Sequence, residues 1–592
     1  MDESGKRNQI AQWAFDTRPV LLRYHLWLED VEIEREQELP VSAYSFAPRG
    51  IVRSVATTAA ATALGTRLFG EFGGAKDPDK RADKQAYNQA KKAADAISAY
   101  VMSEGLWHLT RSLPENHAIM VCLGEGLMPK AGETPEMGAN PLLGFGRVYA
   151  RPEVAHIVDA AVRALLNDPG HSFADFYESL RSRGITVWGA AVDTLENTSR
   201  FAEGKDTGPM TVFHLFDSPL TVTRPYEAYM GCLTVPRAVR KAADEAAVLL
   251  DWATPRARLV EAIERAYPGI AREHIHVWTL RGKSRAGRLG RLWDEWTALG
   301  VHLVEDGWKA PSGLGVFTDS GTYAPTFLVR SWTDDAGAVH MMLVDGYAAT
   351  AEALQAASLS EVLDVDCTMA PLSPKFELPH DSEYAMMQLH PSAPDFAARL
   401  GALFGETLSP ERVKFYGDAI EQSEQSNIPL GKRVLRADDF LPEKRWRTLS
   451  CMGYISDDPY TGAPGVTRLA DDRYRVSVRL ATRHASSLVH FTFRLMEGFE
   501  GSRLVFSPLL VRFLSGVDYT RRPVKVSDSG RLRNELQTML TQALEYEGET
   551  IRVHFDRVDD KVMPRDKQVA IRKLLEWYKA EHPVWFQWLE IA

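Results

Sequence analysis

The sequence contains little cysteine and no arrangement that would let its cysteines act together. Four cysteines occur in 592 residues, all more than 80 positions apart and none in a C-x-x-C pair. They are Cys122, Cys232, Cys367 and Cys451. This pattern excludes a disulfide framework and is typical of a reducing compartment. We therefore expect a cytoplasmic protein with buried thiols.

A signal peptide and a long uncharged apolar run are also missing. Residues 1–6 are polar and lack the apolar stretch that a secretory signal requires. The most apolar segment, residues 51–72, holds only 13 uncharged residues between Arg53 and Arg67. A helix needs about 20 such residues to cross a bilayer, so we expect no membrane partner.

Positive charge is in the minority. The formal net charge is −10 and the isoelectric point is near 5.9. Proteins that bind nucleic acid present a basic face to the phosphate backbone, so we expect no nucleic-acid partner. The hydrophobic fraction of 45% and the charged fraction of 25% are those of a globular protein. A chain of this length exceeds one compact core.

The apolar pattern predicts a mixed α/β fold with a central α/β core, a helical N-terminal region and an α+β C-terminal domain. Four regions are expected: a helical region at 1–114, the α/β core at 115–390, a helical segment at 391–460 and the α+β domain at 461–592. In the core, apolar runs at 118–123, 185–190, 210–216 and 275–280 alternate with helical periodicity at 152–166, 236–250, 256–266 and 285–299. Such alternation is typical of α/β folds.

Two shorter predictions concern single elements. Pro19, followed by Leu22, Leu26 and Ile33 at roughly helical spacing, predicts a helix near the N-terminus. The apolar residues at 326–329 predict a strand.

Two segments stand outside this pattern. Between Gly126 and Gly144, glycine and proline each recur every six residues. That period fits either a plain loop or an extended strap with one apolar face that covers a site. The apolar tail at 584–589 is expected to dock on its own domain or on a second subunit, as in a homo-oligomer.

The most informative segment is a basic turn that follows the run at 275–280. Five of the eleven residues from Arg281 to Arg291 are basic. Cations at a helix N-terminus oppose the helix dipole, so a bound anion would stabilise the arrangement. We expect Lys283, Ser284, Arg285 and Arg288 to bind a small anionic, phosphorylated metabolite, with Ser284 as the helix N-cap. The alternative is a solvated helix start that meets acidic groups of the same chain.

This turn is not a P-loop. Arg281-Gly282-Lys283-Ser284 matches the end of G-x-x-x-x-G-K-[ST], but Val277 occupies the position of the first glycine. Only the general anion-binding chemistry of a helix start remains.

Two histidines precede the turn. His274, His276 and Trp278 alternate onto one face of a predicted strand. A His-x-His pair can ligate one metal ion, which would indicate a metal-dependent hydrolase. Otherwise these histidines help to bind the anion, with His276 taking part in catalysis, or form hydrogen bonds in the core.

Two aspartates are candidates for acid–base chemistry. Asp319, Ser320 and Thr322 lie in a Gly-rich loop, and Asp345 ends a predicted strand. Asp319 and Asp345 are expected to act as a general acid–base pair or to hold Mg²⁺ or another divalent ion, while Ser320 and Thr322 bind substrate. A plain β-turn is the alternative for the loop.

These observations favour a soluble metabolic-type enzyme that acts on a small anionic metabolite. Phosphoryl transfer, hydrolysis and elimination remain open as reaction classes. The two other hypotheses are the metal-dependent hydrolase and a non-catalytic assembly protein.

Overall fold

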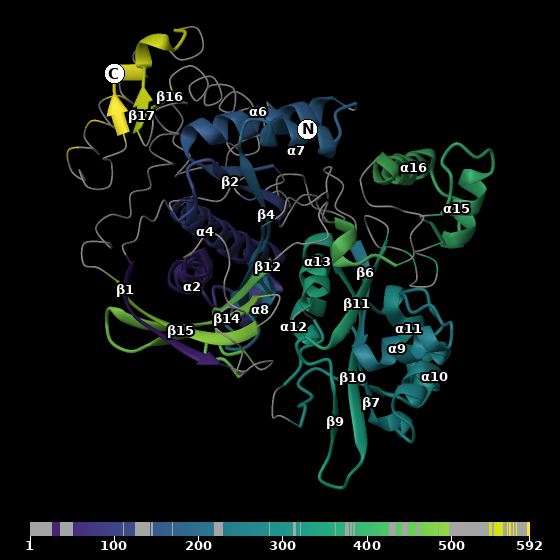
Figure 1. Cartoon of the computed structure of the whole chain (residues 1–592). Helices are drawn as coiled ribbons and strands as arrows, with labels where there is room; N and C mark the ends of the chain where they lie inside the picture. The colour runs from purple at the N-terminus through teal and green to yellow at the C-terminus, as the bar shows by residue number, and fades with distance from the viewer. Residues whose placement is uncertain are drawn as a thin grey trace.

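The computed structural model describes most of the chain between residues 26 and 592 (Figure 1). The described residues are 26–35, 51–110, 112–124, 143, 146–168, 170–217, 229–282, 285–311, 315–319, 321–361, 363–372, 378, 382, 385–386, 388–425, 434–440, 448–458, 462–482, 485–495, 544–547, 550–560, 565, 568–569, 572, 576, 580 and 589–592. The segment at 126–144 lies outside them except for position 143, as does the tail at 584–588. The fold is mixed α/β, as predicted.

A nine-stranded sheet forms one half of the molecule. Its strands, in spatial order, are β1 (Leu26–Arg35), β15 (Ala485–Leu495), β14 (Arg473–Thr482), β12 (Thr448–Tyr454), β5 (Met210–Phe216), β4 (Thr186–Glu196), β2 (His117–Gly124) and β3 (Val148–Ala150), with β13 (Val466–Arg468) beside β14. Only β2 and β4 are parallel neighbours in this order. The sheet takes strands from all four regions expected from the sequence.

Helices cover both faces of this sheet. One face packs against α2 (Ile51–Phe69) and α4 (Lys84–Thr110), the other against α6 (Pro152–Asn167), α7 (Phe173–Arg181) and α13 (Thr350–Ser358). In β4, Trp188 and Val192 face α2 and α4, while Val187 and Ala191 face the opposite layer. Burial on both sides explains why these strands appear as continuous apolar runs.

A six-stranded sheet forms the second half and carries the predicted site. Its order is β11 (Val365–Pro371), β6 (Tyr229–Pro236), β10 (Val339–Ala349), β7 (Ile275–Trp278) and β8 (His302–Leu303), with β9 (Ser331–Thr333) beside β10. Strands β10, β7 and β8 are parallel. Helices α9 (Arg237–Glu245), α10 (Arg256–Ala266) and α11 (Ala286–Ala298) lie beside this sheet and share its core (Figure 1).

The remaining elements are smaller. The helices are α3 (Pro78–Ala82), α8 (Thr198–Ala202), α12 (Tyr323–Thr326), α15 (Phe396–Phe404) and α16 (Pro410–Gln425), and the 3₁₀ turns are η2 (Arg272–His274), η4 (Leu359–Glu361), η5 (Ala437–Phe440) and η7 (Phe555–Arg557). Near the C-terminus, β16 (Leu544–Glu547), β17 (Thr550–Val553) and β18 (Leu589–Ile591) form a three-stranded sheet.

Two predicted elements were wrong. Where the structure describes the expected N-terminal helix, from residue 26 on, the chain instead forms strand β1, which pairs with β15 more than 450 residues later in the sequence. The expected strand at 326–329 is replaced by α12 and the turn after it. All four cysteines are buried thiols. Within the described part of the chain, no helix is both long and apolar enough to cross a membrane.

Candidate functional site

The basic turn lies where two parallel strands end. Strands β7 and β10 run side by side, from Ile275 opposite Met341 to Trp278 opposite Val344. The chain leaves β7 through the basic turn, while β10 continues past Gly346 and Tyr347. In open α/β sheets, ligands bind outside the carboxyl ends of such strands.

The helix after this turn begins one residue later than expected. Arg285 is the N-cap of α11, without a side-chain capping bond, so the prediction of Ser284 as N-cap was wrong. The first turn of α11 contains no acidic residue. Lys283 and Ser284 lie outside the described residues.

Two of the predicted arginines meet on one tyrosine. The Nη1 atom of Arg285 donates a hydrogen bond to the hydroxyl of Tyr347 at 2.8 Å. The guanidinium carbons of Arg285 and Arg288 lie 5.8 and 5.9 Å from the centre of the Tyr347 ring. Tyr229 packs edge-on against that ring. Both arginines are half-buried.

The loop that carries Asp319 is tied to the basic turn. The backbone N–H of Arg281 donates to the carbonyl of Thr318 at 2.8 Å, and Trp278 Nε1 donates to the carbonyl of Phe317 at 2.6 Å. These two bonds hold the loop against the end of β7. Asp319 directly follows Thr318 in this loop. Ser320 lies outside the described residues, and Thr322 is fully buried.

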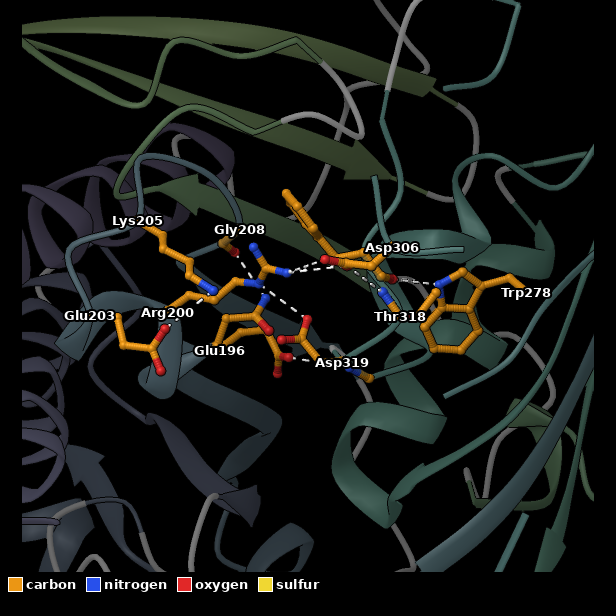
Figure 2. Close-up of polar contacts among 12 residues, drawn as sticks. Glu196, Arg200, Glu203, Lys205, Gly208, Trp278, Asp306, Thr318 and Asp319 are labelled. Atoms are coloured by element: carbon orange, nitrogen blue, oxygen red, sulfur yellow. Dashed lines mark hydrogen bonds and ion pairs between the residues drawn. The ribbon is translucent and has the colours of Figure 1, made fainter. Parts of the chain in front are cut away.

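Arg200 of α8 holds Asp319 in place (Figure 2). Its Nε donates to Asp319 Oδ1 at 3.1 Å, and its Nη2 donates to Asp306 Oδ1 at 3.2 Å. The guanidinium also lies 3.7 Å from the centre of the Phe317 ring. The side chain of Arg200 is 6% exposed and that of Asp319 47% exposed. The arginine thus joins the two halves of the molecule and leaves Asp319 within reach of solvent.

Asp345 is not beside Asp319 in this network. Its carboxylate is fully buried and accepts hydrogen bonds from Arg256 Nε at 2.8 Å, from Arg256 Nη2 at 2.7 Å and from Trp296 Nε1 at 2.7 Å. Both oxygens are therefore engaged, and Arg256 neutralises the charge. This geometry favours a structural role for Asp345 and separates it from the expected acid–base or Mg²⁺ pair with Asp319.

The two predicted histidines lie at the opposite end of β7. His274 belongs to η2 and precedes the strand, so the expected alternation of both histidines on one strand was wrong. His276 has one ring nitrogen 2.7 Å from His302 Nδ1 and the other 3.1 Å from His340 Nδ1. Each nitrogen of His276 therefore faces a different imidazole. Among the residues that the structure describes, no group of three or more His, Cys, Asp or Glu side chains could hold a metal ion.

Burial keeps His276 neutral. The residue is 8% exposed. Desolvation, with smaller effects from His302, His340 and His274, lowers the pKa of His276 to about 3. A base with that pKa is a poor general base near neutral pH, so the structure gives little support to His276 as a catalytic residue.

Several residues at these sites were missed in the sequence. Arg200 and Arg256 carry no local signal, because their aspartate partners are 119 and 89 positions away. Tyr347 follows Asp345 by two positions and belongs to the same strand end, so attention to that end could have found it. His302 and His340 become partners of His276 only through the packing of β8 and β10 beside β7.

Comparison of the sequence with protein-family models and with curated proteins gives no match. The interpretation of the site therefore depends on its own geometry and chemistry.

Proposed function

We propose that this chain is a metabolic-type enzyme that binds a small anionic, phosphorylated metabolite at the basic turn. The observation that supports this proposal best is the position of Arg285 and Arg288. Both lie at the start of α11, around the hydroxyl and ring of Tyr347, and at the carboxyl ends of β7 and β10.

The electrostatics of the turn fit a phosphate group. Guanidinium groups bind phosphate oxygens through paired hydrogen bonds, and the N–H groups at a helix start add further donors. The first turn of α11 supplies no carboxylate of its own to neutralise these charges. A phosphate would add negative charge beside the two guanidinium groups and the positive end of the helix dipole.

Asp319 is the candidate acid or base of this enzyme. It is half-exposed and lies on the loop that is hydrogen-bonded to Arg281 of the turn. Phosphoryl transfer, hydrolysis and elimination all use a group that accepts or donates a proton, so each fits this carboxylate. The metal-dependent hydrolase is the less favoured hypothesis, because the nitrogens of His276 face other imidazoles.

Thermal unfolding with and without inorganic phosphate or pyrophosphate tests the binding step. A ligand at ten times its Kd stabilises the native state by about 1.4 kcal/mol. We expect stabilisation by these anions, but not by chloride at equal ionic strength, and its loss in the Arg285→Ala/Arg288→Ala variant.

Arg258→Ala is the matched control. Arg258 lies in α10, is half-exposed and pairs with Glu261, so its removal should leave the anion effect intact. An unchanged anion effect in the double variant would refute the proposed site.

A further inference from the structure

Five side chains at the amino end of β7 form a continuous row, which we call the histidine chain. In order they are Glu305, His302, His276, His340 and Asp334. The four contacts measure 3.2, 2.7, 3.1 and 3.2 Å between nitrogen or oxygen atoms. Each is therefore within hydrogen-bond distance.

The row follows from the strand pairing. His276 of β7 lies opposite His302 of β8 in the parallel register. His340 lies on β10, the other neighbour of β7, and Asp334 begins the β9–β10 turn. The ring of His276 stacks on Trp332 at 5.3 Å and approaches Trp308 at 4.9 Å. The fold thus fixes the order of the row.

When every imidazole is neutral, the row has one proton fewer than its four contacts need to become hydrogen bonds. Four hydrogen bonds need four protons, and a carboxylate supplies none, while three neutral imidazoles supply three. With three protons, two lone pairs face each other at one of the four contacts. One additional proton satisfies all four.

We infer that the histidine chain is a proton-binding site that takes up one proton beyond its three neutral imidazoles and shares it between His302 and His340. When His302 carries the charge, it donates from Nδ1 to His276 Nδ1, and His276 donates from Nε2 to His340 Nδ1. When His340 carries the charge, both of these bonds run in the opposite direction. The two forms differ by the shift of one proton along each bond, and no atom is gained or lost.

Both forms keep the central ring neutral. Burial lowers the pKa of His276 to about 3, so charge belongs on the outer rings. Each outer ring has a carboxylate at its far nitrogen, Glu305 beside His302 and Asp334 beside His340. These carboxylates stabilise the imidazolium on either side.

Further ionisable groups surround the row. His274 of η2 stacks on His340 at 3.9 Å. Arg281 acts on Glu305, whose pKa is raised by burial but lowered on balance by a backbone hydrogen bond, by His302 and by Arg281. The pKa of Asp334 is lowered by the backbone N–H of Ala338 and by His340. Both carboxylates therefore stay ionised, as the proton count requires.

Uptake of a second additional proton would disrupt the hydrogen bonds of the row. With both outer rings charged, His276 would receive a donor at each nitrogen and would have to give up its own proton. The site thus takes up one proton without rearrangement, whereas two separate His–carboxylate pairs would take up two.

The His276→Phe variant tests this count, because phenylalanine keeps the stacking on Trp332 but separates the two ends. Proton uptake of the full chain is measured by potentiometric titration from pH 9 to pH 5. Ring nitrogen shifts of His302 and His340 are followed by NMR on ¹⁵N-histidine-labelled protein. In the unaltered chain, we expect both outer rings to move about half-way to the charged position. In the variant, both should move fully, and uptake should rise by one proton per chain.

The Asp334→Asn variant keeps the test decisive if the first variant does not fold. It removes one carboxylate from the row, so the shared proton should stay on His302. The ring nitrogen shifts of His340 should then remain at their neutral position. Independent full shifts of both rings in the unaltered chain would overturn the proposal. So would stoichiometric Zn²⁺ binding that abolishes both signals.

Discussion

Two arginine–aspartate pairs in this protein have different surroundings. The pair of Arg256 and Asp345 is sealed in the core of the six-stranded sheet, with side chains that are 2% and 0% exposed. In the other pair, Arg200 is also buried, with 6% of its side chain exposed, but Asp319 is 47% exposed. The sequence places Asp319 in a Gly-rich loop and Asp345 at the end of a predicted strand, and it makes both of them candidates for acid–base chemistry. The difference in exposure makes one a structural anchor and leaves the other available for chemistry.

The largest expected effect is at the buried pair. Asp345→Ala should lower the free energy of unfolding by about 3–5 kcal/mol, because it leaves the guanidinium of Arg256 without a counterion in the core. Chemical denaturation measures the loss. The double variant Asp345→Leu/Arg256→Met should recover part of it, since no unpaired charge remains. A loss below about 1 kcal/mol in the single variant would contradict the structural role.

The comparison extends to His214, a buried side chain whose ring nitrogens contact the hydroxyl groups of two serines. Its Nε2 lies 2.9 Å from the hydroxyl of Ser450, and its Nδ1 lies 3.4 Å from the hydroxyl of Ser358. Burial lowers its pKa to about 3 from 6.5. Between these pH values the unfolded chain binds a proton that the native state does not, so stability falls as pH decreases.

His214 alone should contribute a slope of about 1.4 kcal/mol per pH unit below pH 6.5. Denaturation midpoints at pH 7, 6 and 5 measure the slope. The His214→Asn variant lacks this titration and should show a smaller pH dependence, while starting from a lower stability at pH 7. An unchanged slope in the variant would show that other groups dominate.

Removal of Arg200 should lower the free energy of unfolding less than disruption of the buried pair of Arg256 and Asp345. Arg200→Met should lower the free energy of unfolding by about 1–2 kcal/mol, through lost contact with the Phe317 ring and lost ion pairs. Asp306 and Asp319 can both be hydrated once the arginine is gone, so no buried charge is left. Comparison with Arg256→Met under the same conditions measures the difference, and equal losses would show that exposure of the partner does not matter.

The sequence predicted the elements that depend on local periodicity. Strand β5 and helix α10 have the expected bounds, because their apolar patterns are strong over the whole element. Strand β1 was misread because its pairing with β15 depends on a partner far along the chain. A short segment with apolar residues at mixed spacing is decided by such contacts.

The candidate site divides in the same way. The basic turn could be found because its charge is local in the sequence. Tyr347 could be noticed at its strand end, but its contact with Arg285 could not be predicted. The two residues are 62 positions apart and meet only through the parallel pairing of β7 and β10. The sequence also could not show which of the two aspartates is the better candidate for catalysis. They differ in burial, and the burial of Asp345 depends on the packing of α10 and α11.

The smallest expected effect on stability is at Asp319, where the effect on function should be greatest. Asp319→Asn should change the free energy of unfolding by less than about 0.5 kcal/mol, because the exposed side chain keeps its shape and a hydrogen-bond acceptor for Arg200. Stabilisation by phosphate should persist, since Arg285 and Arg288 are untouched. Turnover of the phosphorylated metabolite that binds most tightly should be lost, as followed by phosphorus-31 NMR.

Asp306→Asn is the matched control, since Asp306 also pairs with Arg200, and it should remain active. Full activity in Asp319→Asn would rule out this carboxylate as the acid or base.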